Sequence, residues 1–558
     1  MKGKKMSKTF SVLLGSYIAM LILGVYFYTP TIRLDFADFW IISLLPILLI
    51  GAVFVLSQPE DFIDEIKLNH PMCLGLFRVL LVSLLALVCI AILTSWGLFR
   101  SSAYKNLITV QESVFSSDHT EVDPNQIRIV DQDVALRLGE KKIGEDSALG
   151  SRAQVGQFTI QTIGGKLYWV APIVHSGFFK WWKYSSEGTP GYVKVSATDE
   201  RDVSLVSGLH IRYQPESFYG QNLERHIYFN GFITRGVSDY TFEVDDAGKP
   251  YWVGTIYRKA VGFFGKDATG VVVVDAQSGE VLEYAIEKAP SWIDRIQPEE
   301  FVAQQLTDWG EFVHGWLNPS NEDRLKVTPG ISLVYGGGQS YWYTGLTSYG
   351  ADESTVGFVL VNTRTKESKM YKQGGATELA AMRSAEGRVQ EKGYNSSFPV
   401  LYNVSGAPTY VMSLKDKGGL VKAVAFVSVE DYSLVGVGET TERALRNYHA
   451  RLARTGTAKL GTAASSKSIS GKLSRIGYDA QYEVYIFTIE QSHLMFFGGP
   501  DLSREFAISR PGDVVKISWV DVGKGEVDIS SFDNVDVPKD IPVVTPKDSV
   551  VTVPVTTP

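Results

Sequence analysis

The chain has 558 residues, 45% of them hydrophobic, and a formal net charge of −7 at pH 7. A net acidic chain argues against sequence-independent nucleic-acid binding, which needs a basic face. The two cysteines are Cys73 and Cys89, so the part after residue 100 has no disulfide, no thiolate metal site and no cysteine nucleophile.

Three apolar segments without a charged residue lie near the N-terminus, at 9–28, 39–57 and 79–99. Each has about 20 residues, enough for a helix to cross a hydrocarbon core of about 30 Å. The sequence therefore predicts a three-helix transmembrane anchor over residues 1–99. The alternative is a cleaved signal peptide followed by a buried helical hairpin.

Lysine and arginine are distributed unevenly around these spans. Three lie on the side that follows the first and third spans (Arg33, Arg100, Lys105) and six on the side of the N-terminus (Lys2, Lys4, Lys5, Lys8, Lys67, Arg78). The positive-inside rule then predicts a multi-pass membrane protein with a cytoplasmic N-terminus. The body, 100–558, is expected outside the cytoplasm.

An internal repeat organises this body. Residues 212–223 (RYQPESFYGQNL) and 295–306 (RIQPEEFVAQQL) match at seven of twelve positions, at an offset of 83 residues. At the same offset, Tyr168-Trp169-Val170 aligns with Tyr251-Trp252-Val253. Two blocks that share one offset indicate tandem copies of one structural unit.

Two weaker copies follow, one opening at Tyr341-Trp342 and one at Tyr410, and every opening follows a Gly-bearing turn. Helices are expected at 376–392 and 439–453, and Pro215 and Pro298 suit first helical turns. Antiparallel strands packed on an amphipathic helix predict an α+β fold, repeated four times.

The predicted order after the anchor has eight parts. They are a membrane-proximal connector (100–160), repeat units 1 to 4 (161–233, 234–317, 318–393 and 394–454), a linker (455–468), a small OB-like β-barrel (469–536) and a disordered tail (537–558). The barrel is predicted from five short alternating segments separated by turns. The linker and the tail are predicted from their composition.

The segment GVVVVDAQSGEVLEY (270–284) resembles the hairpin of a known protein module. Its hairpin, preceded by a helix, looks like the PepSY module of secreted and membrane-anchored bacterial proteins. That resemblance implies peptidase binding or inhibition, or sensing in the cell envelope. Unit 3 has Thr365-Lys366-Glu367 where the hairpin glycine is expected, and unit 4 lacks the signature. The resemblance therefore supports architecture more than activity.

Two places are candidate sites for a partner. In FFKWWKY (178–184), Phe178, Phe179, Trp181 and Trp182 are expected to dock a partner or to enter the lipid interface, with core packing as the favoured alternative. Asp352 and Glu353 are a second candidate, for a cation or for acid–base chemistry, with a solvated acidic loop as the default. No motif assigns a catalytic, cofactor or metal site.

The sequence thus favours a membrane-anchored, non-enzymatic scaffold or interaction protein that displays tandem PepSY-like modules. Its expected partners are the lipid bilayer and a protein or peptide in the cell envelope. One alternative is a membrane tether for single-stranded nucleic acid, bound by aromatic and basic residues of the barrel (Tyr485, Phe487, Phe496, Phe497, Lys472, Arg475, Lys516). The favoured role of those aromatics is to fill the barrel. The other alternative is an envelope hydrolase with an unrecognised site.

Overall fold

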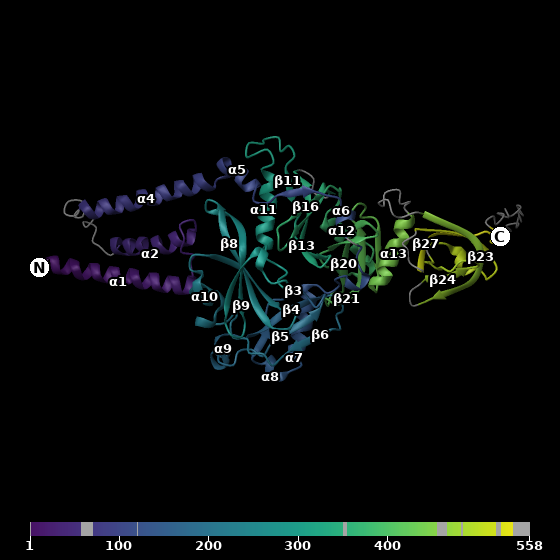
Figure 1. Ribbon diagram of the computed structural model, residues 1–558, viewed down its shortest axis with the longest axis horizontal. Coiled ribbons are helices and arrows are strands. Elements are labelled where there is room, and N and C mark those ends of the chain that lie inside the picture. Colours follow the sequence, from purple (N-terminus) through teal and green to yellow (C-terminus); the bar gives the residue numbers. More distant parts are fainter. Residues whose placement is uncertain are drawn as a thin grey trace, which may run out of the picture. The chain divides into compact units, whose positions relative to one another are not determined.

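The computed structural model describes residues 2–56, 71–119, 121–349, 354–454, 466–480, 484–500, 502–520 and 526–538. The chain divides into two compact bodies, Met1–Thr441 and Glu442–Pro558, called here the N-terminal and C-terminal bodies. Both combine helices with β-sheets, so the fold is α+β as predicted (Figure 1).

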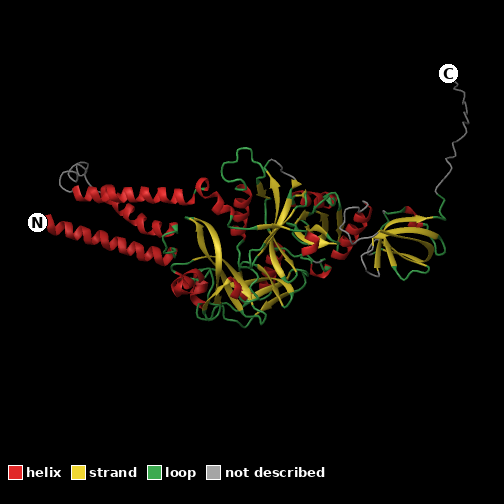
Figure 2. Cartoon of the chain, turned by 45° about the horizontal axis from the view of Figure 1, so that its top comes forward, coloured by secondary structure: helices red, strands yellow, loops and turns green. Residues whose placement is uncertain are grey.

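The three apolar segments all form helices: α1 (Lys2–Tyr28), α2 (Ala37–Leu56) and α4 (Pro71–Ser95). They project from the same side of the N-terminal body (Figures 1 and 2). Pro46 is accommodated inside α2.

Length and apolar composition single out one bent pair of helices. Over the described residues, Val82–Ser95 and Gly97–Lys105 together meet the criteria for a membrane span, with a bend of 45° between them. No single described helix meets them alone. The second member of the pair is α5 (Gly97–Lys105).

Four sheets follow, each built mainly from strands of one predicted repeat unit; the sheets of units 1 and 3 also contain strands from the segment 100–160. Their strand orders are β2-β4-β5-β6 with β3 on β4, then β10-β9-β8-β7, then β1-β16-β15-β13-β11 with β12 on β13, and β18-β20-β21-β22 with β19 on β20. The strands of the first two sheets are β2 (Ala153–Val155), β3 (Thr159–Ile163), β4 (Lys166–His175), β5 (Tyr192–Ser196), β6 (Val203–Val206), β7 (Gly236–Val244), β8 (Pro250–Val261), β9 (Phe264–Asp275) and β10 (Val281–Ala285).

The other two sheets contain β1 (Val110–Glu112), β11 (Leu325–Val327), β12 (Ser332–Gly336), β13 (Gln339–Ser348), β15 (Gly357–Asn362), β16 (Ser368–Tyr371), β18 (Asn395–Ser396), β19 (Val400–Val404), β20 (Ala407–Lys415), β21 (Val421–Ser428) and β22 (Val435–Gly438). A separate two-stranded sheet pairs β14 (Ser354–Thr355) with β17 (Gly375–Ala376). Short helices are α6 (Phe115–Asp118), α8 (Ser147–Gly150), α9 (Phe178–Tyr184), η1 (Pro124–Gln126), η2 (Tyr219–Gln221), η3 (Tyr228–Phe232), η4 (Ile286–Lys288) and η5 (Gln390–Lys392).

Each predicted Gly-bearing turn joins two antiparallel strands: β3–β4, β7–β8, β12–β13 and β19–β20. In the first, Gly164 and Gly165 have φ of +56° and +77°, and in the third, Gly337 and Gly338 have +60° and +74°. Glycine adopts this left-handed region without the steric cost of a Cβ, which is why these residues mark hairpins in the sequence.

A helix leads each sheet, and a backbone hydrogen bond joins the two. The N–H groups of Val130, Gln297 and Ala376 donate to the carbonyls of Ala197, Thr363 and Val429, at 3.0, 2.7 and 2.8 Å. The donors lie just before α7 (Gln132–Gly144), α11 (Glu299–Glu311) and α12 (Glu378–Gly387). The acceptors directly follow β5, β15 and β21, each of which is called here the third strand of its unit. Each repeat unit therefore begins with the helix before its sheet. Unit 1 includes α7 from the segment 100–160, unit 2 includes residues 212–233, unit 3 includes α11 and unit 4 includes α12.

The turn after the third strand is also repeated. Asp275 Oδ1 accepts from the backbone N–H of Gln277 and Ser278, and Asn362 Oδ1 accepts from Arg364 and Thr365. Ser196 and Ser428 use their hydroxyls in the same way. Lys366 has φ +65° where unit 2 has Gly279 at +81°, so unit 3 forms this turn without the glycine.

Unit 2 departs from the predicted helix. Helix α11 begins directly after Pro298, but α10 (Leu223–Ile227) begins eight residues after Pro215, so the prediction of a first helical turn at Pro215 was wrong. Tyr219 adopts a left-handed φ of +50°, which does not fit inside a right-handed α-helix. The Asn222 side chain then caps α10 by accepting from Arg225 N–H.

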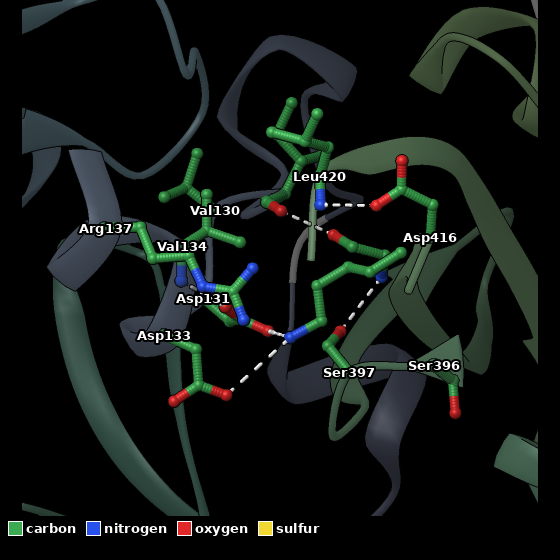
Figure 3. Close-up of polar contacts among 12 residues, drawn as sticks. Val130, Asp131, Asp133, Val134, Arg137, Ser396, Ser397, Asp416 and Leu420 are labelled. Carbon is green, nitrogen blue, oxygen red and sulfur yellow. Dashed lines mark hydrogen bonds and ion pairs between the residues drawn. The ribbon is translucent and has the colours of Figure 1, made fainter. Parts of the chain in front are cut away.

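Units 1 and 4 are joined by a polar cluster (Figure 3). Lys415 Nζ lies 2.5 Å from Asp131 Oδ2 and 3.8 Å from Asp133 Oδ2. The other carboxylate oxygen of Asp131 caps α7 by accepting from Val134 N–H at 2.9 Å. One carboxylate thus starts a helix and binds the neighbouring unit.

The C-terminal body holds most of α13 (Thr441–Arg454) and a closed barrel of order β23-β24-β25-β27-β26. The strands are β23 (Ser466–Asp479), β24 (Val484–Ile489), β25 (Met495–Gly498), β26 (Val514–Val520) and β27 (Glu526–Asn534), with η6 (Arg504–Ala507) before β26. Only the β25–β27 pair is parallel among them. Phe487 and Phe496 belong to the buried core of the barrel, as favoured from the sequence, and Phe497 is also buried but lies outside that core.

Candidate functional site

A cavity of about 770 Å³ lies where repeat units 1, 2 and 3 meet in the N-terminal body. Its lining is drawn from equivalent positions of the three units. These are a second-strand tryptophan (Trp169, Trp252, Trp342), the facing first-strand pair (Thr159-Ile160, Thr241-Phe242, Ser332-Leu333), a residue at the start of the lead helix segment (Gln132, Glu216, Glu299) and an arginine before it (Arg128, Arg295). The repeat therefore produces the cavity.

The second-strand aromatic side chain follows one hydrogen-bonding rule. Trp169 Nε1 donates to Val130 O and Trp342 Nε1 to Gln297 O, each at 2.8 Å. In unit 4, which has tyrosine here, Tyr410 donates its hydroxyl to Ala376 O at 3.2 Å. Each acceptor carbonyl belongs to the residue whose own N–H donates to the end of the third strand. The ring therefore helps to hold the segment just before the helix against the sheet.

Trp252 of unit 2 breaks this rule. Its side chain is 5% exposed, and its indole N–H has no hydrogen-bond partner among the described residues. Here the bonds to Ala276 O come from Arg212 and Tyr213, one residue earlier than the match between RYQPE and RIQPE predicts. The carbonyl of Gln214 instead accepts from Ser217 and Leu223. Burying an unsatisfied donor costs about 1–3 kcal/mol.

The arginines show the same departure. The Arg128 guanidinium lies 6.0 Å from the ring centroid of Trp169, and that of Arg295 lies 5.8 Å from Trp342. Arg212 turns away and donates Nε to Gln277 O at 2.9 Å. Unit 2 thus leaves its tryptophan without the cation that covers the other two.

Other donors at the cavity wall also lack partners. Arg295 Nε and the Ser332 hydroxyl have no hydrogen-bond partner among the described residues. Beside them, Thr241 donates its hydroxyl to Glu243 Oε1 at 2.9 Å. Burial, and to a smaller extent the charge of Asp294, raise the pKa of Glu243 to about 8, so Glu243 is protonated at neutral pH. The wall therefore presents hydrogen-bond donors.

Exposed carboxylates add acceptors to the lining: Asp133, Glu216, Asp239 and Glu299. Burial of part of the side chain raises the pKa of Glu216 and of Glu299. A lining with both unpartnered donors and exposed acceptors matches an extended peptide, whose backbone alternates carbonyl and N–H groups. The described lining contains no histidine or cysteine to act as a nucleophile or base.

A second cavity, of about 1030 Å³, is lined by Asp118 and His119 among others. Asp118 and His119 belong to one hydrogen-bond network. Tyr371 donates its hydroxyl to Asp118 at 3.0 Å, Ser113 donates to the same oxygen at 2.6 Å, and His119 Nε2 lies 3.2 Å from the Tyr371 hydroxyl. Burial lowers the pKa of His119. This network stabilises the fold. Elsewhere in the lining, the side-chain oxygen Asn403 Oδ1 is buried and has no hydrogen-bond partner among the described residues.

The residues predicted from the sequence lie elsewhere. Trp181 on α9 is buried and donates Nε1 to Gln221 Oε1 at 2.9 Å, so it belongs to the core. Phe178 is half-buried, whereas Phe179 is 84% and Trp182 64% exposed. Asp352 and Glu353 lie outside the described residues.

Sequence reasoning missed the central cavity, although one signal was present. Trp169 and Trp252 share the repeat offset, and Trp342 follows in unit 3. The match of Arg128 with Arg295 was hidden because Val130-Asp131 replaces the Gln-Pro pair of the other units.

Comparison with known proteins leaves the family open. No family model matches the chain, and no curated protein matches it. A solved structure of Trypanosoma rangeli sialidase in complex with 2,3-difluorosialic acid aligns with 68% of this chain and about half (52%) of its own, at 8% identity and a TM-score of 0.16. A likeness this weak is evidence of neither a shared fold nor a shared function. Among the described residues, no group of three or more His, Cys, Asp or Glu is placed to hold a metal ion.

Proposed function

We propose that this chain is a membrane-anchored, non-enzymatic interaction protein whose tandem PepSY-like units bind a peptide segment of a partner in the cell envelope. The binding site is the central cavity of units 1 to 3. The observation behind this proposal is the buried, unpartnered indole N–H of Trp252, in a position where its three counterparts all donate to a backbone carbonyl.

The chemistry of the missing partner follows from those counterparts. Each donates to the carbonyl of an extended segment that runs past the ring. A peptide carbonyl from outside supplies the same acceptor to Trp252. The Ser332 hydroxyl and Arg295 Nε supply further donors, and the exposed Glu216 and Glu299 accept from peptide N–H groups or basic side chains.

Two further features support the architecture. A helix leads each antiparallel sheet, and residues 270–284 form the hairpin of β9 and β10, which is the arrangement implied by the PepSY resemblance. The helices α1, α2 and α4, together with the distribution of lysine and arginine, support an anchor with the body outside the cytoplasm.

Panning a random peptide display library against the full chain in lipid nanodiscs tests this proposal. Selected peptides should lose at least about tenfold in affinity for Trp252→Phe, since one hydrogen bond to a peptide is worth about 1.4 kcal/mol. Trp316→Phe, which changes an exposed tryptophan outside the cavity, should bind as the natural chain does. No enrichment over empty nanodiscs, or equal binding to both variants, would overturn the proposal.

The barrel is proposed to be OB-like, because the order β23-β24-β25-β27-β26 with a parallel β25–β27 pair has the connectivity of that fold. It is not proposed to bind nucleic acid. Phe487 and Phe496, candidates for base stacking, are buried in the barrel. No arrangement among the described residues favours the hydrolase alternative.

A further inference from the structure

Large exposed aromatic side chains gather where the three apolar helices meet the rest of the N-terminal body. They come from five separate parts of the chain and form what is called here the aromatic rim: Tyr28, Trp96, Phe99, Phe229, Phe264 and Trp316, which are 55%, 47%, 57%, 48%, 60% and 44% exposed. Scattered exposed apolar residues are normal, but a group of aromatic rings marks a contact surface.

Hydrogen bonds hold the rim against the helix ends. Ser95, the last residue of α4, accepts from Phe263 N–H at the tip of the β8–β9 hairpin at 2.9 Å. Tyr228, beside Phe229, donates its hydroxyl to Pro30 O at 2.8 Å. The rings of Trp96 and Trp316 lie 6.2 Å apart. The aromatic rim therefore lies beside the ends of the apolar helices, where these helices meet the rest of the N-terminal body.

Helix α9 extends this rim. The rings of Trp181 and Tyr219 lie 5.9 Å apart. Arg225 donates to the carbonyl of Tyr219 at 2.9 Å and to the carbonyl of Tyr26, near the end of α1, at 2.8 Å. Figure 1 shows α9 close to the edge of the body from which the helices project. Its two most exposed rings, Phe179 and Trp182, are thus placed near the same level.

The chemistry of α9 fits the interfacial region of a bilayer. Aromatic rings favour that region, and lysine side chains beside them extend toward headgroups. Of the two lysines beside the exposed rings, Lys183 is exposed and lies 5.1 Å from the Tyr184 ring centroid, whereas Lys180 donates to Ser151 O. A lipid surface is favoured over a protein partner because the rim is continuous with helix sides that are apolar and exposed, such as Val82 and Leu85 at 64% each.

We infer that α9 inserts Phe179 and Trp182 into the interfacial region of the bilayer that α1, α2 and α4 cross. The N-terminal body then lies against the membrane through a second contact, separate from the anchor. This inference rests on the membrane anchoring in the proposed function.

Site-directed spin labelling of the full chain in nanodiscs of phosphatidylcholine tests it. With Cys73 and Cys89 replaced by serine, a label is placed by Phe179→Cys, and its relative accessibility to oxygen and to a water-soluble nickel chelate is measured. Labels at Ile90→Cys and Leu420→Cys are references. Ile90 is 53% exposed on α4, and Leu420 is 56% exposed in repeat unit 4.

The oxygen-to-nickel ratio at Phe179→Cys should exceed that at Leu420→Cys several-fold and approach that at Ile90→Cys. If positions 179 and 420 both give the aqueous ratio while position 90 gives the lipid ratio, the insertion of α9 is refuted and the anchor stands. If position 90 is also aqueous, both proposals fail. Low access of both reagents at position 179 would indicate a protein contact and would likewise overturn the inference.

Discussion

The unpartnered N–H of Trp252 leads to a stability prediction with internal controls. Trp342→Phe removes the bond to Gln297 O and leaves that carbonyl without its donor. Trp252→Phe removes a donor that has no acceptor. Both substitutions remove the same atoms from tryptophans that are 4% and 5% exposed, so the loss of packing is closely matched. The difference between the variants then reports the hydrogen bond.

Its magnitude follows from the two environments. Leaving the Gln297 carbonyl unsatisfied costs about 1–3 kcal/mol, and removing the unsatisfied Trp252 donor recovers a similar amount. The weaker attraction of phenylalanine for the Arg295 guanidinium adds about 0.5 kcal/mol to the cost of Trp342→Phe. We therefore expect Trp342→Phe to be less stable than Trp252→Phe by about 2.5–6.5 kcal/mol.

The assay heats the full-length variants in detergent and measures the folded fraction by size-exclusion chromatography. Trp342→Phe should lose the folded peak several degrees below Trp252→Phe, and Trp169→Phe should behave like Trp342→Phe, because its N–H bonds to Val130 O. Equal destabilisation by all three substitutions would refute the reasoning, since it would mean that the Trp252 N–H has a partner in the folded protein.

Three further predictions concern pH, a tight turn and topology. Glu243 is protonated in the folded protein, with its pKa raised from 4.5 to about 8; the stability linked to this proton is complete below pH 4.5 and is lost as the pH rises through 8. Between pH 5 and 8, the free energy of unfolding of Glu243→Gln should therefore fall less steeply with pH than that of the natural chain, by up to about 1.4 kcal/mol per pH unit. Equal slopes for the two proteins in thermal unfolding would contradict this. Gly279→Ala should destabilise the protein more than Gly406→Ala in the same assay. Both glycines have φ above +80°, but only a Cβ at Gly279 would clash with the Tyr213 ring. Equal destabilisation would mean that the Tyr213 ring does not pack against this turn. A reporter enzyme that is active only outside the cytoplasm should be active when it is fused after Pro558. Activity of a reporter that works only in the cytoplasm would contradict the predicted orientation.

Local signals in the sequence were sufficient for the hairpins and for several helices. Gly164-Gly165 and Gly337-Gly338 adopt the left-handed turns that glycine permits. Helix α12 forms within the predicted segment 376–392, and α13 ends one residue beyond the predicted segment 439–453. Such features depend on neighbouring residues, so composition and spacing indicate them.

The same reasoning failed where distant segments compete. RYQPESF and RIQPEEF are nearly identical, yet only the second begins a helix at its proline. In the first, Phe218 packs 5.4 Å from the ring of Trp181, a residue 37 positions earlier, and Tyr219 takes a left-handed φ. Tertiary packing thus overrides the helical pattern in unit 2.

The sequence by itself determined the apolar helical segments, the hairpins and the repeat, because each is encoded by neighbouring residues or by their recurrence. Only the tertiary structure decided which hydrogen bonds join each leading helix segment to its sheet, that unit 2 slips by one residue, and that three tryptophans meet around one cavity. Each of these depends on hydrogen bonds between residues far apart in the chain, such as Gln297 and Thr363. The candidate site arises where one copy of the repeat departs from the bonding of the other three, a difference that is absent from the residue pattern.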